Sequence, residues 1–232
     1  MFLANTSLTE ALNIFIEEFP LGLWETLYAT IISTFFAIII GLPLGVLLVV
    51  GDKDGILPLP KPIMVILNGI INIFRSIPFL ILMILVLPLS KLIIGKEVGT
   101  VATIIPLIIA SFPFIARLVE SSLREVNPSL IEAALSMGAS PFQIIMKVYI
   151  RESVPSLISN ITIALTTILG YTAMSGSIGG GGLGKIAISY GYYRYITLVM
   201  ILAVIVLVLL VQGIQSLGTF LATKLDRRLR NN

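Results

Sequence analysis

The chain has 232 residues, of which 57% are hydrophobic and 12% are charged, and its mean hydropathy is +1.06. This composition is too apolar for the core of a soluble domain and indicates a protein that resides in a lipid bilayer. The absence of cysteine and histidine excludes disulfides, thiol and imidazole catalysis, and nearly all zinc or haem sites. The basic residues behind the net charge of +3 are spread along loops, so we expect membrane lipid and no nucleic acid as a partner.

Five segments have the length and apolar character of membrane-spanning helices. We expect spans at 26–50, 76–89, 98–115, 157–178 and 195–217. The first contains Gly41 and Pro43, both of which a membrane helix tolerates. The start of the second is open, because residues 63–74 are also apolar. The expected fold class is all-α, a polytopic membrane protein of about five transmembrane helices in a single domain, 1–232.

The basic residues predict how the chain is oriented in the membrane. If the loop 116–156 is cytoplasmic, 11 of the 15 basic residues lie on that side: Lys53, Lys61, Arg75, Arg117, Arg124, Lys147, Arg151, Lys224, Arg227, Arg228 and Arg230. The first 25 residues carry four glutamates and no basic residue, so they suit the exterior and do not resemble the start of a signal peptide. We therefore expect a multi-pass protein with its N-terminus outside and its C-terminus in the cytoplasm.

A compact polar loop at about 124–151 carries the signals of a first short helix. Asn127 and Pro128 end the preceding helix, and Ser129 with Glu132 has the spacing of a capping box, in which each side chain bonds the other residue's backbone N–H. Gly138 stands where a left-handed residue would end this helix.

The same loop then opens a second helix. Ser140 is a good N-cap, Pro141 suits the first helical position, and Gln143 stands three residues after the cap. The loop is therefore predicted to be a helix-turn-helix elbow. Such detailed helix signals between two apolar segments indicate that a partner docks there.

The residues from Glu132 to Ile150 resemble the EAA loop of ABC importer permeases. They have Glu-Ala-Ala at 132–134, glycine at 138 and two aliphatic residues at 148 and 150, but Arg151 replaces the proline that ends the family pattern. The resemblance implies that the short helix is a coupling helix that fits a groove on a cytoplasmic ATPase. The implied ATPase-coupling residues are Glu132, Ala133, Ala134, Gly138, Ala139 and Ser140.

Further motifs narrow the resemblance to the methionine ABC importer permease. They are Arg75-Ser76-Ile77-Pro78-Phe79, Arg124-Glu125-Val126, the segments 170–178 and 179–184, and Tyr190-Gly191-Tyr192. The resemblance covers roughly residues 20–220 and implies the type I ABC importer permease fold in a bacterial cell membrane. It also implies a homodimer of permease chains, a cytoplasmic ABC ATPase dimer that binds ATP and Mg²⁺, and an extracytoplasmic methionine-binding protein. The chain itself would bind no cofactor and would not be catalytic.

The glycine run 179–184 matches two nucleotide-binding patterns that we reject. Gly179, Gly184 and Lys185 have the P-loop spacing, but Ile186 stands where Ser or Thr would hold Mg²⁺. A dinucleotide fold needs an acidic residue about twenty positions on, and none occurs between Glu152 and Asp226. We expect instead a flexible re-entry turn or a close backbone approach between subunits, because glycine permits both.

Polar side chains of the fourth span are candidates for the translocation path. Thr162 and Thr166 lie one helical turn apart, and Ser175 and Ser177 lie near the end of the segment. Two interpretations are open, since these hydroxyls either line the path or bond their own helix backbone. The family resemblance places Met174 at a hydrophobic pore constriction, where its flexible thioether would suit a gate.

An intramembrane enzyme is the alternative from a different functional class. It would need paired carboxylates inside the membrane, yet Glu120, Glu125, Glu132 and Glu152 all lie in or beside the loop. We therefore favour a passive translocation subunit that alternates between inward-open and outward-open states. Within that class, a permease for another amino acid or small organic solute is the alternative to methionine.

Overall fold

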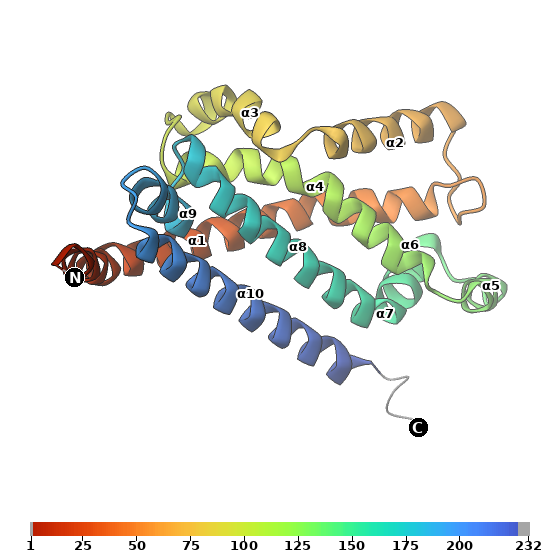
Figure 1. Ribbon diagram of the computed structural model, residues 1–232. Coiled ribbons are helices and arrows are strands. Elements are labelled where there is room, and N and C mark those ends of the chain that lie inside the picture. Colours follow the sequence, from red (N-terminus) through yellow and green to blue (C-terminus); the bar gives the residue numbers. More distant parts are fainter. Residues whose placement is uncertain (1, 227–232) are drawn as a thin grey trace. The chain divides into compact units, whose positions relative to one another are not determined.

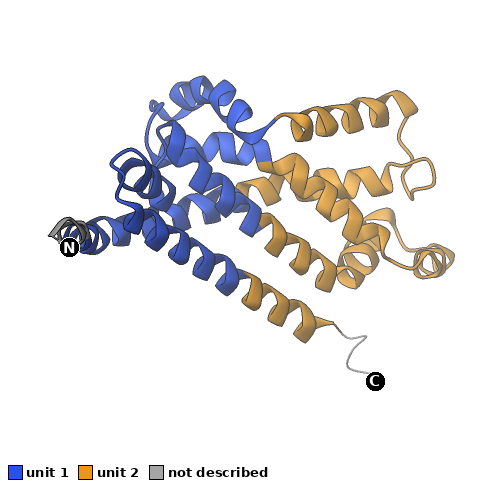
Figure 2. Ribbon diagram, in the orientation of Figure 1, with its two compact units in different colours: residues 1–35, 78–110, 165–214 blue, residues 36–77, 111–164, 215–232 orange. Residues whose placement is uncertain are grey.

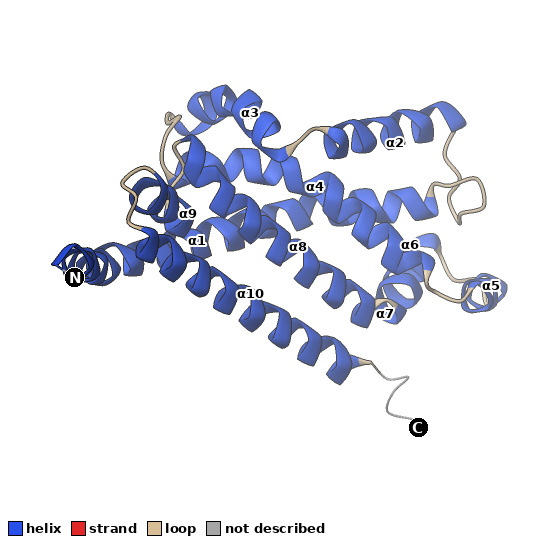
Figure 3. Ribbon diagram, viewed as in Figure 1, coloured by secondary structure: helices blue, strands red, loops and turns tan. Residues whose placement is uncertain are grey.

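The computed structural model describes residues 2–226, with side chains from residue 8 on, and every regular element in that part of the chain is helical (Figures 1 and 3). The helices are α1 (Phe2–Val50), α2 (Lys61–Ser76), α3 (Phe79–Ile94), α4 (Thr100–Arg124), α5 (Pro128–Ser136), α6 (Pro141–Ile144), α7 (Ile150–Glu152), α8 (Val154–Ser175), α9 (Gly182–Ile186) and α10 (Thr197–Leu225). Two π-helical turns, Ile145–Tyr149 and Ala187–Tyr192, and a 3₁₀ turn, Gly176–Ile178, complete the set. Arg227, Arg228 and Arg230 lie outside the described residues.

The helix lengths agree with the expected all-α membrane fold. Four helical stretches are long and apolar enough to cross a bilayer: Leu8–Val50, Thr100–Arg124, Pro141–Ile178 and Thr197–Leu225. Helices α2 and α3 pass the same test together, as a pair separated by a short break, which gives up to five spans.

The predicted second span, 76–89, lies mostly in α3, but its predicted start at residue 76 is wrong. Helix α2 ends at Ser76, Ile77 has the extended backbone angles φ −80° and ψ 125°, and α3 begins after Pro78. Proline offers no backbone N–H and disfavours helical angles in the residue before it, so the chain leaves the helix at Ile77.

Other helices also extend well beyond their predicted bounds. Helix α1 starts well before residue 26, α4 continues past residue 115 to Arg124, and α10 continues past residue 217 to Leu225. Apolarity marks the part of a helix that can sit in lipid, whereas the helix itself continues until a breaking signal appears. For α4 that signal is Asn127-Pro128, as expected from the sequence.

The chain divides into two compact units, each built from three separate segments (Figure 2). Unit 1 comprises residues 1–35, 78–110 and 165–214, and unit 2 comprises 36–77, 111–164 and 215–232. Helices α1, α4, α8 and α10 each contribute residues to both units.

Unit 1 has a core in which the early part of α1 packs against α9 and the start of α10. Its fully buried members include Ala11, Leu183 and Val199. Hydroxyl groups also join helices of this unit. Thr30 Oγ1 on α1 and Thr172 Oγ1 on α8 form a hydrogen bond of 3.2 Å. Burial of these apolar surfaces positions α9 beside α1.

The core of unit 2 joins α1, α2 and α4 through Leu48, Ile71 and Ala116. A glycine permits the close approach of α1 to α4, because a Cβ atom on Gly45 would lie 2.6 Å from the Ala116 carbonyl oxygen. A Cβ atom on Gly41 would lie 2.8 Å from the carbonyl oxygen of Phe112, also on α4. The glycines of the first span are therefore contact points between helices.

Candidate coupling elbow and translocation segment

The first helix of the elbow, α5, is capped by Asn127. The Asn127 side chain accepts a hydrogen bond from Ser129 N at 3.0 Å, and Pro128 occupies the first helical position. The predicted capping box of Ser129 and Glu132 is therefore wrong. Pro128 has its φ fixed near the helical value, so the helix starts at Pro128. The cap is therefore Asn127, two residues before the predicted cap Ser129. Glu132 lies one turn into the helix with its side chain exposed.

The turn after α5 has the geometry expected from the sequence. Gly138 has φ +74°, and its N–H donates to the Leu135 carbonyl oxygen at 2.9 Å. Ala139 N donates to the Ala134 carbonyl oxygen at 3.1 Å, which completes the Schellman pair of hydrogen bonds. No heavy atom lies within 4 Å of a Cβ built on Gly138. Glycine is thus required for its backbone angle and not for space.

The second helix opens with the predicted capping box. Gln143 N donates to Ser140 Oγ at 3.4 Å, and Ser140 N donates to Gln143 Oε1 at 2.9 Å. The helix continues through a π-helical turn and past Arg151, where the family pattern has proline, and it breaks at Ser153 with φ −91° and ψ 0°. Pro155 then lies in the first turn of α8, so the bend comes two residues later than the family pattern places it.

The elbow presents an apolar surface that the sequence analysis missed. Met137 and Phe142, on either side of the Gly138 turn, are 81% and 72% exposed. Among the predicted coupling residues, Glu132, Ala133, Gly138 and Ser140 are exposed, Ala139 is half-buried and Ala134 is 5% exposed. Large apolar residues flanking a capped glycine turn were the available signal, because a surface turn normally carries polar residues.

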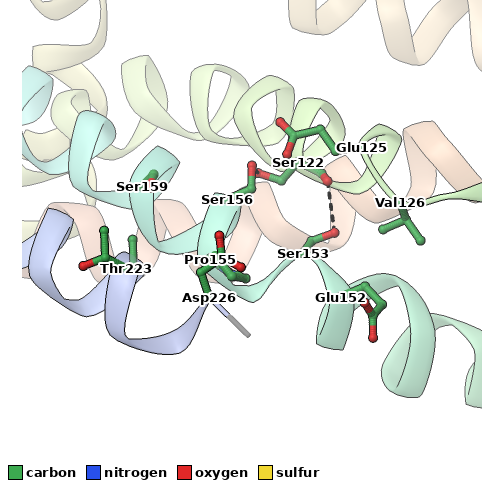
Figure 4. A pocket seen from close by; sticks show the side chains of 11 residues that line it. Ser122, Glu125, Val126, Glu152, Ser153, Pro155, Ser156, Ser159, Thr223 and Asp226 are labelled. Atoms are coloured by element: carbon green, nitrogen blue, oxygen red, sulfur yellow. Dashed lines mark hydrogen bonds between the residues drawn. The ribbon is translucent and has the colours of Figure 1, made fainter. Parts of the chain in front are cut away.

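A cluster of hydroxyl and amide groups ties the start of α8 to the end of α4. Ser153 Oγ donates to the Ser122 carbonyl oxygen at 3.0 Å (Figure 4), and Asn160 Nδ2 donates to Ser122 Oγ at 2.8 Å. These hydrogen bonds connect α4, which precedes the elbow, to α8, which follows it. Beside them lies a cavity of about 350 Å³ that is also lined by the carboxylates of Glu125, Glu152 and Asp226. Within residues 2–226, no group of three or more His, Cys, Asp or Glu side chains is placed to hold a metal ion.

Arg117 on α4 is the centre of a polar network in unit 2. Its Nη1 donates to Glu120 Oε2 at 2.6 Å, and its Nη2 donates to the side-chain oxygens of Asn68 at 2.8 Å and Asn72 at 3.0 Å. The Arg117 and Glu120 side chains are 21% and 12% exposed. A mostly buried guanidinium needs such partners, and this one bonds α4 to α2.

Arg124 extends the network toward the loop after α1. It donates to Glu120 Oε1 at 3.0 Å and to Asp52 Oδ2 at 2.9 Å. Two hydrogen bonds lower the pKa of Asp52 below its ordinary value. The bond from Arg124 has the larger effect, and the bond from Lys53 N has the smaller one. A lowered pKa means that Asp52 stabilises the fold above the ordinary pKa of Asp, and that this contribution is lost as the pH falls through the lowered pKa.

The hydroxyls proposed for the translocation path bond their own backbone. Thr162 Oγ1 donates to the Ile158 carbonyl oxygen at 2.8 Å, Ser175 is buried and donates to that of Thr172 at 2.6 Å, and Ser177 donates to that of Met174 at 2.7 Å. Thr166 is half-buried on α8. This favours the backbone-bonding interpretation for the three hydroxyls. The side chain of Met174 is 50% exposed.

The glycine run packs closely inside unit 1. A Cβ on Gly184 would overlap the carbonyl oxygen of Ala173, so α9 contacts α8 through backbone. Gly182 N donates to Glu25 Oε2 at 2.7 Å and Leu183 N donates to Thr26 Oγ1 at 2.9 Å, which satisfies the start of α9. The close approach therefore occurs within the chain. The role of Glu25 was missed, and its signal was a carboxylate beside a hydroxyl at the edge of an apolar segment.

Helices of membrane length, with a capped elbow between two of them, define a polytopic membrane protein. Residues 41–231 match the family described as binding-protein-dependent transport system inner membrane component, and the chain belongs to this family. It is thus a multi-pass inner-membrane component of a transport system, as predicted, and not itself an enzyme.

Several known proteins are similar to this chain over most of its length. The "Probable D-methionine transport system permease protein MetI" of Vibrio cholerae is 47% identical over 205 residues, covering 88% of this chain and 91% of the relative. The protein of the same name in Pasteurella multocida is 48% identical over 212 residues, covering 91% and 97%. A solved inward-facing structure of the MetNI methionine ABC transporter has a TM-score of 0.86 at 45% identity, covering 89% and 95%. An amino acid ABC transporter at 19% identity, with a TM-score of 0.74, shares the fold.

We predict that Arg117→Met destabilises the protein by about 2 kcal/mol or more, because it leaves Glu120 and two asparagines without their shared donor. Thermal unfolding of the purified complex in detergent measures this. The matched control is Arg75→Met, at the exposed end of α2, which should shift stability by less than about 0.5 kcal/mol. Equal unfolding temperatures for the two variants would show that the network contributes nothing.

Proposed function

We infer that the chain is the permease subunit of an ATP-driven importer and that it translocates methionine delivered by an extracytoplasmic binding protein. The observation that carries this is its 47% and 48% identity with two MetI proteins, each over about nine-tenths of the chain. The TM-score of 0.86 with the MetNI transporter supports the same function. ATP and Mg²⁺ bind the partner ATPase, and this chain supplies the route through the membrane.

The elbow is the part of the chain that contacts the ATPase. Its caps define the starts of two short helices, and the exposed side chains of Met137 and Phe142 offer apolar surface for a groove to bury. The second elbow helix leads into α8, whose start is bonded to α4. A displacement of the elbow is therefore passed directly to two membrane helices of unit 2.

Two copies of the chain surround one translocation path. Met174 supports this arrangement, because half of its apolar side chain is exposed on α8 and is available to meet the Met174 of a second copy. The paired thioethers form the narrowest point of the path. The hydroxyls of Thr162, Ser175 and Ser177 contribute little to it, since they bond their own helix.

We expect radiolabelled methionine to accumulate in proteoliposomes that hold the permease, its ATPase and its binding protein. Accumulation should require ATP and the binding protein. Uptake of another amino acid or organic solute in place of methionine would overturn the substrate assignment while leaving the importer class intact.

In the same vesicles, Met174→Ala should leak methionine or hydrolyse ATP without accumulation, because it widens the constriction.

Gly138→Val should reduce uptake about tenfold, because a left-handed backbone costs a β-branched residue roughly 1–2 kcal/mol and misplaces the elbow. The matched control is Gly138→Asn, since asparagine tolerates this backbone and should retain most of the uptake. Both variants should insert into the membrane normally, as no heavy atom lies within 4 Å of the added Cβ. Normal substrate-stimulated ATP hydrolysis in the Gly138→Val complex would contradict a coupling role for the elbow.

The chain is oriented with its N-terminus outside and its C-terminus in the cytoplasm. The support is the distribution of basic residues, of which 11 of 15 fall on the side of the elbow. Because the protein has no cysteine, single cysteines introduced near residues 5 and 230 can be labelled in intact cells and inverted vesicles. The two positions should react from opposite sides. Reaction from one side would require an even number of spans.

A further inference from the structure

Unit 1 contains a cavity of about 350 Å³ that the transport role described above does not use. It is formed by α1, α9, the π-helical turn Ala187–Tyr192 and the loop that follows. Its lining carries charges of both signs, the carboxylates of Glu18 and Glu25 and the cations of Lys185 and Arg194, and its apolar side chains include Leu21 and Ile186.

The polar wall of this cavity is held in place by its own contacts. Tyr190 Oη donates to Glu18 Oε1 at 3.2 Å, and the Arg194 guanidinium lies 4.6 Å from the centroid of the Tyr190 ring. Burial, followed by the Glu18 hydrogen bond, raises the pKa of Tyr190, so the phenol remains a neutral donor. Glu25 is fixed separately by its bond from Gly182 N.

The backbone in and next to the cavity wall departs twice from regular geometry. Ala187–Tyr192 forms a π-helical turn, and Tyr195, which follows the lining residue Arg194, has φ +59°, the one positive φ outside glycine among the described residues. Tyr195 is 86% exposed, so its side chain has little packing that could stabilise this angle. Unfavourable backbone of this kind is concentrated at binding sites, where it directs particular side chains toward a ligand.

The opposite charges of the cavity form no ion pair with one another. Among the ion pairs of residues 8–226, none joins Glu18 or Glu25 to Lys185 or Arg194 within 4.0 Å. Four charged groups that face one space without pairing leave room for a molecule that carries both charges. Two like charges on a ligand would meet repulsion, since a dicarboxylate faces two glutamates and a diamine faces two cations.

We propose that this cavity binds the zwitterionic head group of a free amino acid. The α-ammonium group lies against Glu18 and Glu25, the α-carboxylate lies against Lys185 and Arg194, and the substrate side chain contacts Leu21 and Ile186. The site rests on the proposed function, because an importer of amino acids is the setting in which a free zwitterion reaches the outer part of α1. The site recognises the head group that all amino acids share. It therefore specifies amino acids as the class of substrate but does not specify the substrate's side chain.

Equilibrium binding of radiolabelled methionine to the permease–ATPase complex in lipid nanodiscs, without the binding protein, tests the site. Unlabelled leucine should compete, because it has the same head group, whereas methionine methyl ester and N-acetylmethionine should not, because each lacks one charge. Lys185→Met should weaken binding at least tenfold, and Glu18→Gln should weaken it similarly. The matched control is Lys96→Met, an exposed lysine of the same unit, which should bind as the wild type does.

Equal methionine binding by the wild type and Lys185→Met would overturn the proposal. So would a wild-type complex that binds no free methionine while binding-protein-dependent uptake proceeds, and that result would leave the transport function standing. Loss of association with the binding protein in Lys185→Met, with unchanged methionine binding, would make the cavity a protein-docking surface and would also overturn the proposal. Uptake of a different amino acid, with head-group binding still dependent on Lys185, would support the site and reject only the methionine assignment.

Discussion

In the hydrocarbon region of a bilayer, a backbone N–H or C=O group without a partner costs several kcal/mol, and this constraint explains most of the structure. It makes every described element a helix. At two of the breaks between helices, a special residue or a side chain accounts for the irregular backbone. Pro78 has no N–H to leave unpaired at the break between α2 and α3, and Glu25 and Thr26 accept the first N–H groups of α9.

The same constraint governs the polar side chains of unit 2. Arg117 is mostly buried, and it is stabilised by one carboxylate and two asparagine oxygens from α4 and α2. Ser122, nearer the C-terminal end of α4, accepts the hydrogen bonds from Ser153 and Asn160 that hold the start of α8. Helix α4 therefore carries both polar junctions, and it also leads directly into the elbow. Through α4, the elbow is connected to α2 by Arg117 and to α8 by Ser122.

Unit 1 uses polar groups differently. Its helices are joined by hydroxyls and by glycines that allow backbone contact, as at Thr30 with Thr172 and at Gly184 with Ala173. Four of its charged residues, Glu18, Glu25, Lys185 and Arg194, line the cavity beside α9 and form no ion pair with one another. The elbow of unit 2 has the opposite character, since it exposes apolar side chains around Gly138. An apolar surface suits a protein partner, whereas a cavity with separated charges suits a small polar solute.

The sequence by itself determined the membrane class, an all-α fold of about five spans, and the elbow with Gly138 and the Ser140 capping box. Each of these depends on local chemistry, namely apolar length, a left-handed backbone or a cap three residues from its partner. The permease family followed from the resemblance of the motifs in the elbow and the glycine run. The break at Ile77, the cap at Asn127, the Arg117 network and the Glu25 contact with α9 were not predicted. The Asn127 cap is local, but Asn127 was interpreted only as the end of the preceding helix, and Pro128 at the first helical position makes it the cap. The Arg117 and Glu25 contacts join residues 49 and 157 positions apart, and only the packing of helices brings such pairs together.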